Sequence, residues 1–413
     1  MDSGAVFDIE DREMRSGVRY GGLAALLLAA GAAVVAVRAS NLAATRAERW
    51  ARGETELRLI APPGSNATLY RAGGTLQEAQ AVGLGRDEVW LTDGRYFLEV
   101  EPESGAGSLF YPIALMTGRR GPDADGSFAV TVRGALPQGP PRLADTTPPF
   151  TFIPAGQFEL GDRRNPGECH HVWLPGFFIS TFEVTNADFR RFLRDPEGYD
   201  HQANWTAAGW NWKQAGTSRV TARLDPSDPK YARFGEDDLP VVLVTWYEAN
   251  AYSRWLTRRL GGRGWLFRLP SEAEWEKAAR GPDTFDYGLG MTLSEPQSRL
   301  YNWKKNPDAE VTLVGFRATT ARYEPNRYGL YHASGNAGEW TQSVSRAYNW
   351  EHPYREDDRN DDEAEGLRVT RGGSWYSATT SRLLLTYREE FQPELSSDDL
   401  GFRLVAARLP NVP

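Results

Sequence analysis

The sequence predicts an α+β protein with one transmembrane helix, then a small all-β domain, then a larger and irregular α+β domain. Three observations carry this prediction. Residues 21–37 contain no charged side chain, and short strand-like runs fill residues 54–134. The chain has 14 Trp and 41 Gly among 413 residues, which favours a loop-rich fold over a helical bundle. This length suits two domains.

Residues 21–37 (GGLAALLLAAGAAVVAV) form the expected membrane segment, after a short N-terminal tail over residues 1–20. As a helix the 17 residues span about 26 Å, near the lower limit for a bilayer. A helix in a soluble core would carry polar residues on one face, and this stretch carries none. Arginines flank both ends, so the positive-inside rule leaves the orientation open. The sequence VRA at 37–39 loosely resembles a signal-peptidase site, so an uncleaved anchor and a cleaved signal both stay open.

An Ala- and Arg-rich stretch over residues 38–53 is predicted to be a helical stalk, and residues 54–134 a small β-sandwich. The strand-like runs are separated by Gly, Pro, Asp and Asn, as in all-β domains. They lie at residues 57–60, 67–70, 88–91, 96–100, 108–111 and 128–132. A proline-rich linker over residues 135–149 follows, and we expect it to be semi-rigid.

The larger domain begins at residue 150 and is expected to contain three helices. Thr185 or Asn186 can cap a helix over residues 187–194. Residues 246–260 place apolar side chains at spacings of three and four, which is the pattern of an amphipathic helix.

The third helix begins after Ser271. Ser271 and Glu274 form a capping box, in which the serine oxygen and the glutamate carboxylate satisfy free N–H groups at the helix start. We therefore interpret Glu272, Glu274 and Glu276 as helix-start and surface groups rather than as acid–base catalysts.

Composition and cysteine usage exclude several functions. A net charge of −8 argues against a nucleic-acid partner, which needs a basic surface. The single cysteine, Cys169, excludes an internal disulfide framework and a Cys-rich zinc site. We interpret Cys169, which stands beside His170 and His171, as a chance thiol, because neighbouring side chains of a strand point in different directions. The acidic run at residues 356–365 lacks the glycine and the final acid of an EF-hand and is interpreted as a solvated loop.

Six motifs occur in a fixed order in the larger domain. They are FIPAGQF at 152–158, FISTFEVTN at 178–186, RLPSEAEW at 268–275, YGLYHASGNAGEW at 328–340, RVTRGGSW at 368–375 and LGFR at 400–403. In this order they resemble the domain of formylglycine-generating enzymes, also called sulfatase-modifying factors, over residues 150–410. The resemblance implies a C-type-lectin-like fold. The preceding β domain loosely resembles PEGA-type domains, with an unrelated β domain as an equal alternative.

The resemblance implies a catalytic pair that this chain lacks. The enzymes oxidise a sulfatase cysteine to formylglycine with two copper-binding cysteines that follow the Gly-Gly-Ser motif. Here the matching segment is GGSWYSATTSR at 372–382, and its register places Ser377 and Arg382 at the two cysteine positions. Because soft thiolate ligands for copper(I) are missing, we expect neither copper nor the family's oxidation chemistry.

The family's substrate groove is expected to lie around these two positions. Aromatic and arginine side chains there favour recognition of peptides, glycans or anionic groups. The candidate ligand-binding residues are Trp375, Tyr376, Ser377, Arg382, Tyr387 and Arg388. No catalytic residue is assigned; Glu389 and Glu390 are weak acid–base candidates, with surface glutamates of a binding loop as the favoured alternative.

Asn336 is the best metal candidate. It follows turning backbone, and the family often carries calcium at this place; a side-chain oxygen beside backbone carbonyls suits that cation. The alternative is that Asn336 only braces its loop. A second calcium site of the family would use Asn302, but Val314 stands where an acidic residue is usual. Valine has no oxygen ligand, so this second site is not expected to hold a metal.

These observations lead to one main hypothesis and two alternatives. The main hypothesis is a membrane-anchored, extracytoplasmic protein whose larger domain binds a protein, peptide or glycan ligand without formylglycine-generating activity. The first alternative is a cysteine-independent oxidoreductase that tailors an exported peptide or metabolite. The second is a ligand-display protein, in which sequence variation would cluster around residues 375–395.

Overall fold

The computed structural model describes residues 44–409, apart from 63–64, 83–88, 102–106, 117–120, 126, 144–148, 217, 262–263, 295–300, 302, 306–323 and 350. The expected membrane segment at 21–37, Asn302 and Val314 lie outside the described residues. Within the described part of the chain, no helix has both the length and the apolar character needed to cross a bilayer.

The smaller domain packs two sheets face to face, with strand orders β4-β1-β7 and β3-β2-β5-β6. A helix over residues 44–51 precedes them, within the stretch expected to be helical. The strands are β1 Glu54–Ile60, β2 Asn66–Arg71, β3 Gln80–Val82, β4 Val89–Thr92, β5 Gly94–Glu101, β6 Leu109–Leu115 and β7 Phe128–Thr131, with a short 3₁₀ helix η1 at Leu76–Glu78. Leu69, Leu98 and Ile113, from β2, β5 and β6, are fully buried in the core of this domain.

The larger domain combines three sheets with six helices among its described residues, which is the expected α+β class. Its sheets have the strand orders β10-β9, β12-β17-β11-β8 and β15-β14-β13-β16. The strands are β8 Phe150–Ile153, β9 Gly156–Leu160, β10 His170–Leu174, β11 Phe177–Ser180, β12 Trp265–Arg268, β13 Gly338–Val344, β14 Arg368–Arg371, β15 Glu389–Phe391, β16 Leu400–Phe402 and β17 Val405–Arg408. The helices are α2 Asn186–Arg194, α3 Ala207–Gln214, α4 Val220–Arg223, α5 Tyr231–Phe234, α6 Trp246–Leu260 and α7 Glu272–Arg280, and the 3₁₀ helices are η3 Gln202–Asn204, η5 Glu356–Asp358 and η6 Thr380–Leu383.

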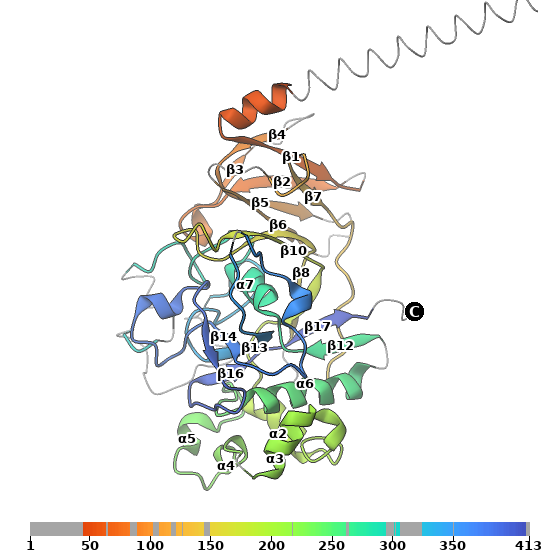
Figure 1. The fold of residues 1–413 in the computed structure, drawn as a ribbon, viewed down its shortest axis with the longest axis vertical. Coiled ribbons are helices and arrows are strands. Elements are labelled where there is room, and N and C mark those ends of the chain that lie inside the picture. Colours follow the sequence, from red (N-terminus) through yellow and green to blue (C-terminus); the bar gives the residue numbers. More distant parts are fainter. Residues whose placement is uncertain are drawn as a thin grey trace, which may run out of the picture.

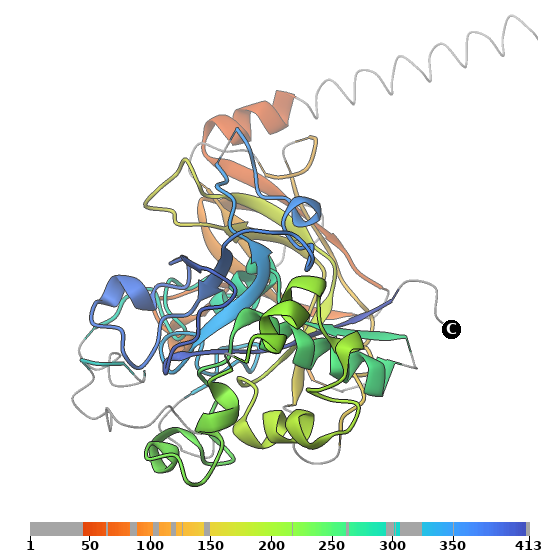
Figure 2. The same ribbon diagram turned by 60° about the horizontal axis from the view of Figure 1, so that its bottom comes forward.

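The three expected helices form as α2, α6 and α7, each with a side-chain cap. Thr185, Thr245 and Ser271 accept the hydrogen bonds that begin the three helices, and each is part of a capping box. Figure 1 shows α2 to α5 at the end of the molecule opposite the smaller domain, and Figure 2 turns this end forward.

The two domains are joined by direct hydrogen bonds as well as by the chain. His171 Nε2 lies 2.6 Å from the carbonyl oxygen of Ala114, and the Tyr328 hydroxyl donates to the carbonyl of Phe110 at 3.2 Å. Each of these bonds connects a residue of the larger domain to β6. The smaller domain is therefore docked on the larger one.

Helix α7 is buried along its whole length, which corrects the interpretation of its glutamates as surface groups. Glu272, Glu276 and Arg280 are spaced four residues apart and so share one face of the helix. Arg280 Nη1 lies 3.2 Å from Glu276 Oε1 and its Nη2 lies 3.1 Å from Glu159 Oε1, while Glu276 also pairs with Arg371. These glutamates can be buried because arginines compensate their charge. One of the arginines lies on α7 itself and others come from segments distant in sequence.

Candidate functional site

A cavity of about 370 Å³ opens at the sheet that contains β13, β14 and β15. Five of the residues proposed from the sequence line it, namely Tyr376, Ser377, Arg382, Tyr387 and Glu389. They come from the turn after β14, from η6, from the loop that follows η6 and from the start of β15. The cavity therefore lies where the sequence placed the family's groove.

A tight turn after β14 brings Gly373 close to Ser377 and Arg382, the two residues at which the resemblance places cysteines. Gly373 has a φ of +64°, and a Cβ at this residue would lie 2.3 Å from the carbonyl oxygen of Arg382. Only glycine allows this approach of two backbone segments. Within the turn, the Ser377 hydroxyl accepts a hydrogen bond from the Ser374 N–H at 2.9 Å. In the described part of the chain no base contacts this hydroxyl, so Ser377 has a structural role in the turn.

An ion pair crosses the cavity wall. Arg382 Nη1 lies 3.1 Å from Glu389 Oε1, and the Tyr387 hydroxyl donates to the same oxygen at 3.2 Å. The Arg382 side chain is 50% exposed and that of Glu389 26% exposed, so the pair faces solvent inside the cavity. Partial burial and the nearby Glu389 carboxylate raise the pKa of Tyr387. Tyr387 is therefore a stable hydrogen-bond donor at neutral pH.

A second carboxylate, Asp399, was missed by the sequence analysis. It lines the cavity directly before the LGFR motif. Its Oδ2 accepts from the Ser374 hydroxyl at 2.7 Å, and its Oδ1 accepts from Ser397. The backbone carbonyl of Asp399 accepts from Gly338 N at 2.8 Å, which ties this loop to β13. The signal for Asp399 was its position beside a motif, but nothing in the local pattern distinguished it from a surface aspartate.

Three of the proposed residues lie outside the cavity lining. Trp375 is 9% exposed and donates from Nε1 to the carbonyl of Asp398 at 3.3 Å. Arg388 Nη2 lies 3.0 Å from Glu272 Oε2 on α7. Glu390 accepts a hydrogen bond from the Ser345 hydroxyl. Each of these three side chains is therefore engaged outside the cavity.

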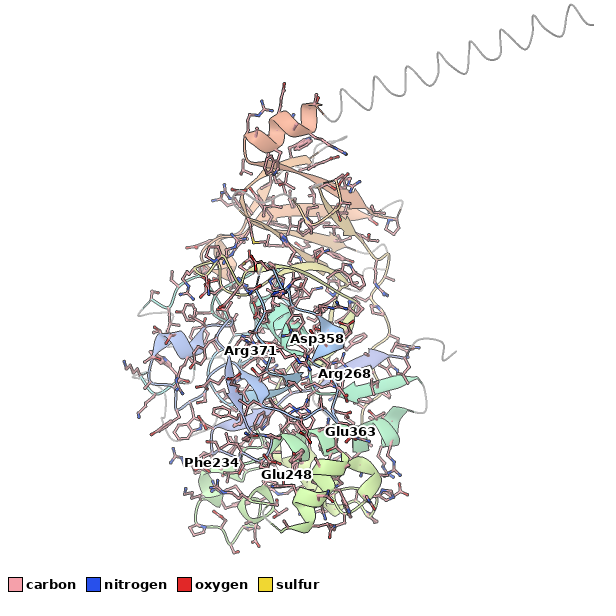
Figure 3. All side chains as sticks on the ribbon, viewed as in Figure 1. Phe234, Glu248, Arg268, Asp358, Glu363 and Arg371 are labelled. Atoms are coloured by element: carbon pink, nitrogen blue, oxygen red, sulfur yellow. The ribbon has the colours of Figure 1, made fainter. Side chains whose placement is uncertain are left out.

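The wall is also held by Arg371, which connects it to the buried ion pairs of α7. Arg371 Nη1 donates to the carbonyl of Tyr387 at 2.9 Å, while the same guanidinium pairs with Glu276. Figure 3 shows Arg371 in the interior of the larger domain, between the smaller domain and the helices at the far end. The position of Tyr387 therefore depends on Arg371, a buried arginine that also borders the cavity, and on the partner of Arg371 on α7.

Asn336 lies in a buried polar cluster. Its φ is +66°, a conformation that Asn tolerates better than most residues. The side-chain amide nitrogen of Asn336 donates to Glu183 Oε1 at 2.7 Å. The backbone carbonyl of Asn336 accepts from Trp375 N at 2.7 Å. Burial raises the pKa of Glu183. Burial, and secondarily the charge of Arg403, lower the pKa of His332 in the same cluster to about 4.

One carboxylate of this cluster, that of Glu339, is already engaged by protein donors. Calcium needs about six to eight oxygen ligands, whereas the Glu339 carboxylate already accepts from Arg403 Nη2 and from Trp275 Nε1, both at 2.7 Å. The described residues contain no group of three or more His, Cys, Asp or Glu placed to hold a metal. The contacts of Asn336 support the bracing role, and calcium at Asn336 stays a prediction.

Cys169 is buried against Met116, with its Sγ 3.6 Å from the methionine Sδ. Burial raises the pKa of this thiol to about 12. The thiolate is the nucleophile and metal ligand, so a thiol that resists ionisation is unsuited to either role.

Comparisons with known proteins identify the class of this chain. The family described as "Sulfatase-modifying factor enzyme 1-like domain" matches residues 137–408. The chain therefore belongs to this family, as the ordered motifs predicted.

The names of individual relatives describe different activities. The mouse protein "Formylglycine-generating enzyme" is 29% identical over 369 residues, which cover 76% of this chain and 90% of the relative. The mouse "Inactive C-alpha-formylglycine-generating enzyme 2" is 30% identical over 292 residues, covering 63% and 86%. "Hercynine oxygenase" of Mycolicibacterium smegmatis is 30% identical over 270 residues, covering 58% and 56%. Among solved structures, Treponema denticola variable protein 1 matches with a TM-score of 0.46 and 23% identity, covering 63% of this chain and 94% of that one.

Proposed function

We propose that this protein is a binding module built on a sulfatase-modifying-factor domain and that it lacks formylglycine-generating activity. The observation that carries this proposal is how Ser377 and Arg382 are engaged, because the resemblance places the family's two cysteines at these residues. The Ser377 hydroxyl is used within its own turn, and the Arg382 guanidinium pairs with Glu389. Neither group is a soft thiolate, so neither can hold copper(I) as a cysteine pair would.

The cavity has the features of a recognition site. Opposite charges stand side by side on its wall at Arg382 and Glu389. Tyr376 and Leu395, which also line it, are 57% and 37% exposed. A ligand bound here covers apolar surface at the rim and meets charged and hydroxyl groups inside, which is the usual composition of a small-ligand site.

In this proposal residues 21–37 anchor the chain in a membrane as a single pass, and the described domains lie outside the cytoplasm. The uncharged segment supports this arrangement. Protease treatment of intact and of permeabilised cells tests it. Digestion of the domains only after permeabilisation of the inner membrane would contradict the proposed orientation.

A cysteine-independent oxidoreductase is the second candidate. The specific observation in its favour is that the cavity is concave and lined by converging polar groups, as an active site requires, rather than a shallow aromatic surface. One relative of this chain is also named as an oxygenase, the hercynine oxygenase described above. The acid–base candidate within the cavity is Glu389, whereas Glu390 lies outside its lining.

One experiment separates the two candidates. The full-length protein is purified under anaerobic conditions, its copper, iron and calcium are quantified, and oxygen uptake is then measured with cysteine-containing peptides. We expect no redox metal and no uptake. The double variant Ser377→Cys with Arg382→Cys serves as the matched control for copper(I) binding. Bound iron or copper together with peptide-dependent uptake by the unmodified protein would overturn the binding-module proposal.

A further inference from the structure

The Arg382–Glu389 pair retains unused hydrogen-bonding capacity of both signs. Among the described contacts, the arginine uses only Nη1, and both partners of Glu389 fall on Oε1. Nε and Nη2 of Arg382, and Oε2 of Glu389, make no further hydrogen bond within the described part of the chain. A donor edge and an acceptor oxygen thus lie next to each other in one cavity.

We infer that this cavity binds a free α-amino acid with a large apolar side chain, with its carboxylate on Arg382 and its ammonium on Glu389. The inference rests on the proposed binding function and names the ligand class of that site. The two charged groups of an α-amino acid are separated by a single carbon atom, so they can reach two neighbouring side chains at once.

Charge balance favours a zwitterion over a simple ion. An anion that binds Arg382 also meets the negative charge of Glu389, and a cation that binds Glu389 meets the positive charge of Arg382. A zwitterion pairs with both, so neither Arg382 nor Glu389 loses a partner in the partly desolvated cavity. The chemistry of the pair therefore discriminates by repulsion as well as by attraction.

The apolar part of the ligand has a place at the rim. Tyr376, Phe391 and Leu395 line the cavity, and Tyr376 is among the most exposed large hydrophobic residues of the described chain. The Lys304 ammonium already lies over the Tyr376 ring, 4.4 Å from its centroid. Because one cation occupies that ring, the ligand ammonium is better placed at Glu389 and the ring is left for apolar contact.

The size of the cavity agrees with a small ligand. Its volume of about 370 Å³ lies at the lower end of the usual range for small-molecule sites, roughly 300–1,000 Å³. This space suits one amino acid better than a folded partner.

The test is isothermal titration calorimetry of the full-length protein at pH 7 with four ligands. L-phenylalanine and L-leucine are zwitterions, N-acetyl-L-phenylalanine is an anion, and L-phenylalanine amide is a cation. We expect L-phenylalanine to bind about tenfold or more tightly than either blocked form, since each block removes one charge-assisted hydrogen bond.

Two variants assign each charge. Glu389→Gln should weaken the amino acid and the amide by about tenfold and leave the N-acetyl form unchanged or tighter, because a repelling carboxylate is removed. Arg382→Met should show the reverse pattern. Glu390→Gln is the matched control, because it removes the neighbouring carboxylate of the same strand, which lies outside the cavity lining and accepts from Ser345. It should leave all four affinities unchanged.

The outcomes separate this inference from the proposed function. Equal binding of L-phenylalanine and its N-acetyl form, or binding unaffected by Glu389→Gln, would overturn the zwitterion assignment and leave a binding pocket. Absence of heat with all four ligands at millimolar concentration would overturn it as well. Failure of the binding-module proposal shows instead as redox metal and oxygen uptake, which the calorimetric result does not affect.

Discussion

Two groups of ion pairs in the larger domain have the same chemistry and opposite surroundings. Along α7, Glu276 pairs with Arg280 and Arg371, and all three side chains are at most 1% exposed. In the cavity, Arg382 and Glu389 form a pair that is 50% and 26% exposed. Arg371 borders the cavity, but Glu276 and Arg280 lie behind it and are closed to a ligand, whereas the cavity pair is open to one. Burial thus separates the charges that hold the fold from those that are available for recognition.

The largest expected effect comes from breaking the buried group. Glu276→Gln removes a carboxylate shared by Arg371 and Arg280 and leaves the buried network with one excess positive charge. Removal of one partner of a buried pair costs about 3–5 kcal/mol of unfolding free energy. Urea denaturation followed by circular dichroism measures it. A loss below about 1 kcal/mol would mean that water reaches this network.

A similar test applies where the smaller domain meets the larger one. Nη2 of Arg95, on β5, lies 2.9 Å from Oδ1 of Asp286, and the Arg95 side chain is 9% exposed. Arg95→Met should lower the unfolding free energy by about 2–4 kcal/mol and separate the unfolding of the two domains. Arg71→Met, an exposed change in the same domain, is the control. A single unchanged transition in Arg95→Met would show that the hydrogen bonds of β6 suffice for docking.

Lys277 differs from Arg280, which is also on α7, because the hydrogen bonds of its buried ammonium go to backbone carbonyls rather than to a carboxylate. Its Nζ donates to Pro154 at 2.8 Å and to Gly156 at 3.0 Å, and burial lowers its pKa from 10.5 to about 7. Between these values the unfolded chain binds more protons than the folded one, so stability should rise with pH. The expected gain is roughly 2 kcal/mol from pH 7 to pH 9.

The measurement is the difference in pH dependence between the unmodified protein and Lys277→Met, from urea midpoints at each pH. The variant should lack the rise. Lys213→Met removes a lysine that pairs with the exposed Asp200 and should keep the rise. Parallel curves for all three proteins would show that Lys277 remains protonated in the folded state up to its ordinary pKa.

The smallest expected effect on stability comes from the cavity pair. Glu389→Gln and Arg382→Met should each change the unfolding free energy by less than about 1 kcal/mol, as for other partly exposed ion pairs. Thermal and urea unfolding measure it on the same samples used for calorimetry. A loss above about 2 kcal/mol would make this pair part of the structural network and remove the contrast with α7.

Local features were predicted well because local forces produce them. Thr185 and Ser271 cap α2 and α7 as expected, since a cap depends only on the next few residues. The ordered motifs correctly indicated the family and therefore the α+β fold of the larger domain. The turn at Gly373 places Ser377 and Arg382 in one cavity, as the register of the motif implied.

The composition of the site could be predicted only in part. Tyr376, Ser377, Arg382, Tyr387 and Glu389 line the cavity. Side-chain direction within such a short segment depends on packing, which a linear pattern does not contain. Trp375 is buried and its neighbour Tyr376 is exposed, while Asp399 lines the cavity at the edge of a motif.

By itself, the sequence determined the family, the helix caps and the absence of the cysteine pair, because each depends on residue identity within a short stretch. Only the tertiary structure decided which charges are buried and which are available. Glu276 and Arg371 are 95 residues apart in sequence, and Arg382 and Glu389 are both ordinary charged residues in a linear reading. The energy of an ion pair depends on its distance and on its exposure to water, and the fold sets both.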